Sequence, residues 1–323
     1  MRDYRSVTDI EGIYVGHATN EEAGTGCTVI VCPAGATGAV DVRGGAPATR
    51  ETDLLRPEET VQVLHAVVLS GGSAFGLAAS VGVADELERR DVGLDVGVAK
   101  VPIVSGACLF DLMCGRADVR PTTADGAAAV ADAFASADKP VVRGNVGAGT
   151  GCTVGKLAGP TRCMKTGLGE GIATCGELVC GALTAVNAVG DVVDPTNGAL
   201  LAGLLDEAGE HLTSSVDALL SLAATMPLER TNTTISCVVT NARLTKAEAT
   251  KVAQMAADAY AHAIRPTHTT NDGDTIFVMA TGEVPIPVDV VGVLATKALE
   301  QAIVDSARSA TGAYGFKAAC DLA

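Results

Sequence analysis

Thr233, in the segment 230–239, is the residue most able to perform chemistry. The segment reads Arg-Thr-Asn-Thr-Thr-Ile-Ser-Cys-Val-Val, a polar approach followed by an apolar run typical of a β-strand. Cleavage between Asn232 and Thr233 would give Thr233 a free α-amine beside its own hydroxyl. Such an amine can take the proton of the attacking hydroxyl, which is the chemistry of an N-terminal nucleophile. Taken alone, the segment is equally typical of a strand edge, because β-branched threonine is common in strands.

Other segments carry polar side chains that a threonine nucleophile needs. Lys156 stands among small and apolar residues, and a lysine near an amine lowers the pKa of that amine by like-charge repulsion. Asp272 and Asp274 precede an apolar strand, and two carboxylates on one loop can orient the threonine. The side-chain amide of Asn187 can donate to an oxyanion. Each also has an ordinary interpretation. Lys156 can simply extend to solvent, Asp272 and Asp274 can belong to a solvated turn, and Asn187 can be a turn residue.

The glycine-rich segments do not match the motifs for other chemistry. In the segment 147–156 the final Gly-Lys is followed by leucine, so it is not a phosphate loop, and its glycine spacing is not the dinucleotide fingerprint. In the segment 71–75, Phe75 stands where a nucleophile elbow has its second glycine. There is no Cys-x-x-Cys pair and the five histidines are dispersed, so we expect no metal and no cofactor.

The bulk composition indicates a folded, acidic protein of 323 residues. Its net charge of -15 would repel phosphate backbones, so nucleic acid is not an expected partner. No apolar run approaches the length that spans a bilayer, and the first residues do not resemble a secretion signal. We therefore expect a cytoplasmic protein without a membrane partner, whose ten cysteines are reduced.

Strands and helices are predicted along the whole chain. Strands are expected at 27–32, 65–70, 233–239 and 275–280, and helices at 74–90, 123–135 and 288–307. A capping box, Thr245 with Glu248, starts a further helix, and Thr123 is a possible cap of the helix it begins. The run 172–193 is predicted to form a hairpin with Asn187 near its tip. Without a repeat or a linker, residues 1–323 are expected to form one layered α/β domain.

Several segments, taken in order, resemble the DmpA-type aminopeptidase/D-esterase family, which also contains the nylon-oligomer (6-aminohexanoate-oligomer) endohydrolases. The resemblance covers nearly the whole chain. It is closer to the nylon-oligomer branch, where the nucleophile is Thr after Asn, than to the branch that uses Ser after Gly. The matching segments are 15–19, 43–53, 69–77, 147–156, 232–235 and 272–275.

The resemblance implies self-cleavage between Asn232 and Thr233, which would give an α chain of residues 1–232 and a β chain of 233–323. It also implies a four-layer αββα sandwich of the DmpA/ornithine acetyltransferase type. The nucleophile would lie at the end of a central strand, in a homo-oligomer that is a tetramer of αβ units. The residues implied around the nucleophile Thr233 are Lys156, Asn187, Asp272 and Asp274.

The function expected from this resemblance is amide hydrolysis. The substrates would be small peptides, amides or ω-amino-acid oligomers, cleaved through an acyl-enzyme on Thr233. One alternative is acyl transfer to an amine, as in the ornithine acetyltransferases, but the sequence lacks their Met-rich segment before the nucleophile. The other alternative is an uncleaved, non-catalytic scaffold.

Overall fold

The computed structural model describes residues 4–137, 139–222 and 232–322 of the chain. The longer strands are β1 (Tyr14–Asn20), β2 (Thr25–Val42), β4 (Leu64–Ser70), β7 (Val104–Cys108), β10 (Leu168–Cys175), β11 (Leu178–Asn187), β16 (Thr233–Ala242) and β18 (Thr275–Val284). The short strands are β3 (Thr49–Arg50), β5 (Leu94–Asp95), β6 (Lys100–Val101), β8 (Thr153–Val154), β9 (Met164–Lys165), β12 (Asp191–Val193), β13 (Leu200–Ala202), β14 (Leu204–Leu205), β15 (Leu212–Thr213) and β17 (Ile264–Arg265). The α-helices are α1 (Ala78–Arg89), α2 (Thr123–Ala135), α3 (Ser215–Leu222), α4 (Lys246–Ala256), α5 (Asp258–Ala263) and α6 (Val288–Arg308).

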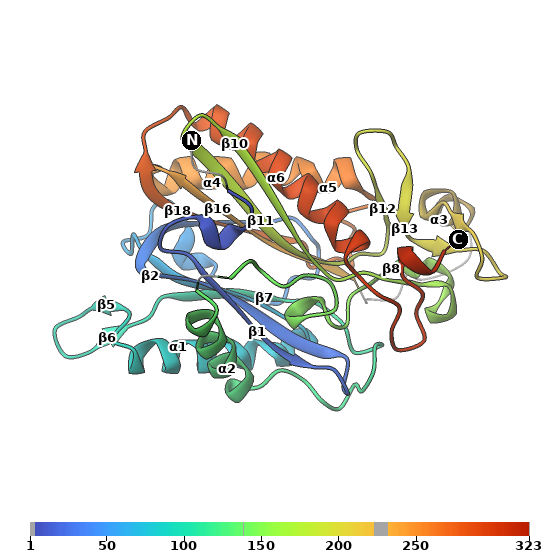
Figure 1. Cartoon of the computed structure of the whole chain (residues 1–323), viewed down its shortest axis with the longest axis horizontal. Coiled ribbons are helices and arrows are strands. Elements are labelled where there is room, and N and C mark those ends of the chain that lie inside the picture. Colours follow the sequence, from blue (N-terminus) through green and yellow to red (C-terminus); the bar gives the residue numbers. More distant parts are fainter. Residues whose placement is uncertain (1–3, 138, 223–231, 323) are drawn as a thin grey trace.

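The long strand β2 joins two halves of the main sheet (Figure 1). Its residues 27–31 pair with both β1 and β4, whereas its residues 37–42 pair with β18. The register with β4 shifts between Val31 and Ala36, a stretch that contains Pro33. Proline has no N–H to donate to a ladder, so an irregularity is expected there. One half thus contains β1, β4, β7 and β3, and the other contains β10, β11, β16 and β18.

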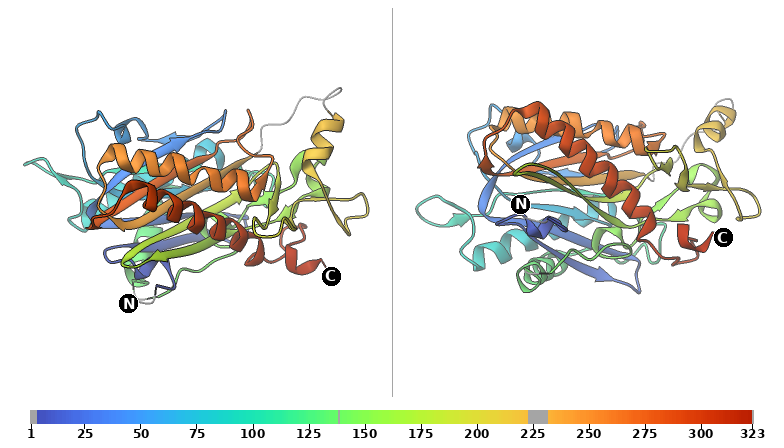
Figure 2. Two further views of the ribbon diagram at one scale, coloured as in Figure 1. Left: turned by 90° about the horizontal axis from the view of Figure 1, so that it is seen from above. Right: turned by 45° about the horizontal axis from the view of Figure 1, so that its top comes forward.

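Helices cover the outer faces of the two halves. Helices α1 and α2 lie beside β1 and β7, and α4, α5 and α6 lie on the far side of the molecule (Figure 1). The helix α6 runs across β10 and β11 (Figure 2). Gly169 and Gly171 of β10 allow this close approach, because a Cβ at either would lie 2.0 Å from a carbonyl oxygen of α6. Within the described residues, no helix has both the length and the apolar character needed to cross a membrane.

Buried apolar residues form three clusters, which follow this arrangement. One lies between α4, α6 and the β10–β18 half, and includes Val238 and Leu299. The second includes Ile30 and Ile235, and therefore joins the two halves of the sheet. The third lies under α1 and α2 and includes Val83. Many members are Ala or Val, so the mixed α/β core is formed with few aromatic side chains.

The strand β16 is central to the half that carries the nucleophile candidate. It pairs antiparallel with β11 and parallel with β18, and all ten of its residues are buried. Burial on both faces explains its continuous run of small and β-branched residues. Because parallel strands start at the same edge, the residues before β16 and β18 meet there. That edge holds the site described below.

The structure confirms most of the longer elements and corrects two details. The helix predicted at 123–135 is α2, but its N-cap is Thr122, whose capping box uses Asp125. The hairpin predicted within 172–193 turns at Gly176, not near Asn187, because Cys175 pairs with Leu178. Gly176 has a φ of 61°, which glycine adopts without steric cost. Asn187 is instead the last residue of β11, at the end of that strand far from the turn.

Candidate active site

Thr233 is the first residue of β16 and is almost completely buried. Its direct neighbour across the antiparallel ladder is Asn187 at the end of β11. The Thr233 hydroxyl donates a hydrogen bond to the carbonyl oxygen of Asn232. The hydroxyl therefore lies against the peptide bond that the sequence singles out for cleavage.

A turn between β17 and β18 lies against the same peptide bond. Asn232 and Asp272 form a parallel bridge, and the N–H of Gly273 donates to the carbonyl oxygen of Asn232 at 3.3 Å. When a nucleophile attacks a carbonyl, negative charge develops on that oxygen, and an N–H already directed at it stabilises the charge. Gly273 was not among the site residues predicted from the sequence. The signal for it was the glycine between two acidic residues.

The glycine-rich segment 43–46 wraps around this turn and explains part of the family-like motif. The N–H of Arg43 donates to the carbonyl oxygen of Asp274 at 3.0 Å, and the N–H of Ala46 to that of Asp272 at 2.8 Å. A Cβ on Gly44 would lie 2.2 Å from the Asp272 carbonyl oxygen. Only glycine permits so close an approach of two backbones.

The carboxylate of Asp274 is occupied by donors on both oxygens. Its Oδ1 accepts the N–H of Thr234 at 2.8 Å. Its Oδ2 accepts the Thr267 hydroxyl at 3.1 Å, and both the N–H and Nδ1 of His268 at 3.0 Å. A carboxylate that accepts four hydrogen bonds is held in one orientation. Asp274 is therefore suited to orient the residue that follows Thr233.

The carboxylate of Asp272 has a different environment. It is 1% exposed, and its Oδ2 accepts the N–H of Thr269 at 2.6 Å. Its Oδ1 is buried and has no hydrogen-bond partner among the described residues. Burial, reinforced by the charge of Asp274, raises the pKa of Asp272 to about 6. Of the two carboxylates, Asp272 is the one with an oxygen free to accept a proton.

Lys156 and Asn187 form a hydrogen-bonded pair on the other side of Thr233. The Lys156 Nζ donates to the Asn187 carbonyl oxygen at 2.9 Å and to its Oδ1 at 2.7 Å. The same Oδ1 accepts the N–H of Thr153 at 3.0 Å, and Nδ2 donates to the Phe110 carbonyl oxygen at 2.7 Å. Desolvation by burial lowers the pKa of Lys156 to about 8. The backbone N–H directed at the Asn232 carbonyl oxygen belongs to Gly273, whereas the Asn187 amide nitrogen donates to Phe110 in this structure.

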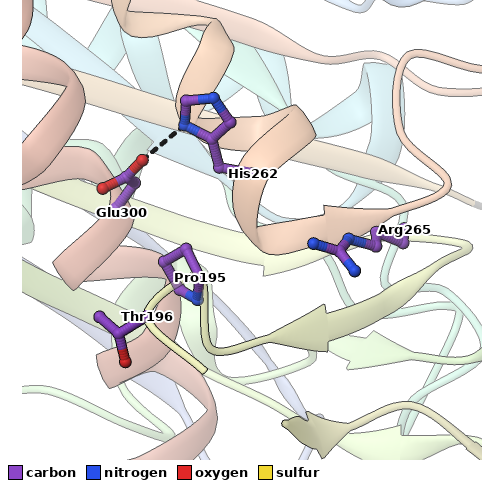
Figure 3. A pocket seen from close by; sticks show the side chains of 5 residues that line it. All are labelled: Pro195, Thr196, His262, Arg265 and Glu300. Carbon is purple, nitrogen blue, oxygen red and sulfur yellow. Dashed lines mark hydrogen bonds and ion pairs between the residues drawn. The ribbon is translucent and has the colours of Figure 1, made fainter. Parts of the chain in front are cut away.

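The structure brings all the residues predicted for the site to one end of β11, β16 and β18. No group of three or more His, Cys, Asp or Glu side chains in the described part of the chain is arranged to hold a metal ion. An open pocket elsewhere contains none of the site residues (Figure 3). It is lined by Pro195, Thr196, His262, Arg265 and Glu300, and its His262 and Glu300 are 2.5 Å apart.

The Thr233 hydroxyl lies beside a carbonyl, an N–H is directed at the oxygen of that carbonyl, and Lys156 is hydrogen-bonded to Asn187 opposite Thr233. Groups of these kinds are used in nucleophilic attack on an acyl group. Acyl hydrolases require groups of these kinds in one site. Residues 5–320 match the model of peptidase family S58, and the chain belongs to that family.

Curated relatives support the same class. The chain is 42% identical to an uncharacterized aminopeptidase of Mycobacterium leprae over 292 residues, which cover 86% of this chain and 79% of the relative. It is 34% identical to a 6-aminohexanoate-oligomer endohydrolase of Paenarthrobacter ureafaciens over 282 residues, which cover 86% and 76% of the two chains. The protein is therefore a hydrolase that acts on amide or peptide bonds, as predicted.

Solved structures share the fold. The L-aminopeptidase D-Ala-esterase/amidase of Ochrobactrum anthropi, described as a variant of the Ntn-hydrolase fold, superposes with a TM-score of 0.69 at 18% identity and covers 97% of this chain and 89% of its own. A β-aminopeptidase of Burkholderia sp. gives a TM-score of 0.68 at 20% identity, with 99% and 92% covered. The mixed α/β fold expected from the sequence is therefore similar to that of the DmpA aminopeptidase.

Proposed function

We propose that this protein is a self-processing N-terminal-threonine amide hydrolase. The observation that carries the proposal is the geometry at one peptide bond. The Thr233 hydroxyl donates to the Asn232 carbonyl oxygen, and the Gly273 N–H donates to the same oxygen. The nucleophile and an oxyanion donor therefore meet at the bond that would break.

Self-cleavage would be an N-to-O acyl shift followed by hydrolysis. The Thr233 oxygen attacks the Asn232 carbonyl carbon, and Asp272 accepts the hydroxyl proton. The C–N bond then breaks, the leaving nitrogen takes a proton, and an ester joins the Asn232 carbonyl to the Thr233 oxygen. Water hydrolyses this ester, which gives a carboxylate on Asn232 and an N-terminal Thr233 with a free amine.

Turnover of substrate would repeat this chemistry with the new amine as base. A free α-amine has a pKa of about 7.7–8.0, and the charge of the nearby Lys156 would lower it further. Thr233 attacks the substrate amide, the amine product leaves with the proton, and water releases the acyl group. Small peptides, amides and ω-amino-acid oligomers are the proposed substrates, which the names of the relatives support.

The remaining proposals concern assembly. We propose that the two halves of the sheet and their covering helices form one domain built as a four-layer αββα sandwich. The three core clusters, two under helices and one between the halves, support this description. We also propose that the cleaved protein is a cytoplasmic homo-oligomer, a tetramer of αβ units.

Intact-mass spectrometry combined with an amide panel tests the function. We expect purified protein to give two chains whose masses sum to the 32.4-kDa precursor plus one water. The cleaved protein should hydrolyse para-nitroanilides or short amides. A single full-length mass in every sample would contradict self-processing and favour a scaffold. Transfer from N-acetylornithine to glutamate without hydrolysis would instead indicate an acyltransferase.

The Gly273→Ala variant should slow both self-cleavage and hydrolysis. A Cβ at this position would lie 2.8 Å from the Thr233 Oγ1 and 3.2 Å from the Ala46 carbonyl oxygen, so the nucleophile or the turn must shift. A misplacement of this kind costs about 100-fold in rate. Time courses of chain cleavage measure it. Gly209→Ala is the control for a glycine substitution outside the site, because its Cβ meets nothing within 4 Å and its φ of 69° still makes the substitution costly to the backbone. Equal rates for the two variants would contradict the role of Gly273.

A further inference from the structure

Two side chains hold the main chain of Thr234, the residue that follows the nucleophile. Its N–H donates to Asp274 Oδ1 at 2.8 Å, and its carbonyl oxygen accepts the Tyr260 hydroxyl at 3.1 Å. The regular pairing between β16 and β18 begins one residue later, at Ile235 opposite Thr275. The placement of Thr233 therefore depends on these side chains as well as on the ladder with β11.

Tyr260 lies on α5 and is completely buried. Its hydroxyl is 2.7 Å from Ser236 Oγ and 3.4 Å from the carbonyl oxygen of Thr275, in addition to the contact with Thr234. The hydroxyl thus bridges β16 and β18 at the edge where the catalytic residues meet. A buried tyrosine hydroxyl requires such partners, but here they belong to the two strands that carry the site.

His268 contacts both of the groups that hold Thr234. Its N–H and its Nδ1 lie 3.0 Å from Asp274 Oδ2. Its ring stacks on the ring of Tyr260, with the centroids 5.5 Å apart and the planes at 21°. The backbone of His268 has a φ of 55°, in the left-handed region that few residues other than Gly, Asn and Asp adopt readily.

The surroundings of the His268 ring determine which nitrogen donates. Nε2 is buried and has no hydrogen-bond partner in the part of the chain that the structure describes. A proton on Nε2 would be a buried donor without an acceptor, whereas a proton on Nδ1 is accepted by Asp274. The ring therefore donates from Nδ1 and orients the Asp274 carboxylate.

We infer that His268 and Tyr260 are positioning residues that set the location of the Thr233 nucleophile through Asp274 and the Thr234 main chain. This role rests on the proposed function of Thr233. Neither side chain needs to touch the substrate. Their loss should therefore slow the chemical step and leave substrate binding nearly unchanged.

Paired substitutions at position 268 test the role. His268→Gly accepts the left-handed backbone and removes the donor, whereas His268→Asn also suits that backbone and keeps an N–H near the position of Nδ1. We expect His268→Gly to lower kcat and the rate of self-cleavage about 10- to 100-fold, since small misplacements of a nucleophile are costly. The KM should change by less than about threefold, because the substitution removes no contact that binds the substrate equally in the ground state and the transition state. His268→Asn should restore most of the rate.

Two further variants complete the experiment. Tyr260→Phe keeps the buried ring and removes only the hydroxyl, and it should lower kcat in the same direction as His268→Gly. His262→Asn is the matched control, because His262 is an exposed histidine on the same helix as Tyr260 and pairs with Glu300. It should behave as wild type.

Three results would overturn the inference. They are a wild-type kcat in folded His268→Gly, a rise in KM alone, or equal loss in His268→Asn and His268→Gly. A wild-type chain that neither cleaves itself nor hydrolyses any amide would instead overturn the proposed function, and the positioning role with it. Thermal unfolding of each variant separates a loss of rate from a loss of the fold.

Discussion

The Thr233→Ala variant is expected to remain one chain of 323 residues and to show no amide hydrolysis. The substitution removes the hydroxyl that contacts the Asn232 carbonyl and leaves the strand β16 otherwise intact. Loss of a catalytic nucleophile typically lowers kcat by about 10⁴-fold or more. Intact-mass spectrometry measures the first effect, and an amide assay measures the second.

Two controls sharpen this prediction. Thr233→Ser retains a hydroxyl at the same position, so it should still cleave itself, although more slowly. Thr234→Ala removes the neighbouring hydroxyl, which is buried and has no hydrogen-bond partner among the described residues, so cleavage should persist. If Thr233→Ala still splits into two chains, the nucleophile has been assigned to the wrong residue.

The Asp272→Asn variant is expected to cleave itself about 10²- to 10⁴-fold more slowly, the range that general acid–base catalysis contributes. The precursor has no free amine at Thr233, so another group must take the hydroxyl proton. Asp272 has a buried oxygen without a hydrogen-bond partner in the described structure and a pKa raised to about 6. Asparagine keeps the shape of the side chain but cannot accept that proton.

The pH dependence of self-cleavage follows from the same carboxylate. Asp272 acts as a base only when ionised, so the wild-type rate should fall as the pH drops through about 6 and level off above it. The profile is measured by stopping the self-cleavage reaction at a series of times and pH values, and quantifying precursor and cleaved chains by intact-mass spectrometry. Asp272→Asn should lose this acid limb. Asp274→Asn should keep the limb but move it to lower pH, because the charge of Asp274 helps to raise the pKa of Asp272. A wild-type rate that does not change between pH 5 and pH 7 would contradict the role of Asp272.

Much of the fold could be predicted because local patterns determine individual elements. The capping box at Thr245 begins α4, and Thr245 accepts the N–H of Glu248 at 3.3 Å. The hairpin was placed wrongly because small and β-branched residues continue through both β11 and β12, and periodicity alone did not locate the turn at Gly176. Pairing of Cys175 with Leu178 determined that turn.

The sequence by itself determined the chemistry available. The pair Asn232-Thr233, the lysine among apolar residues and the two acidic residues around Gly273 are all readable without a structure. The role of Gly273 could not be predicted from the sequence, because this residue acts through its backbone N–H and has no side chain that would indicate a function.

Only the tertiary structure decided which groups lie around Thr233, the proposed nucleophile. The register of β11 on β16 places Asn187 opposite Thr233, and a slip of one residue would turn its side chain to the other face. His268 lies six residues before Asp274, but its left-handed backbone and its stacking on Tyr260 of α5 are what bring both side chains to the site, and neither is readable from the sequence. The two carboxylates have the same side chain, but Asp274 accepts four hydrogen bonds while Asp272 has one buried oxygen without a partner in the described structure. Burial and different hydrogen-bond donors, from the loop 267–269 and from Thr234, thus give two identical side chains different environments.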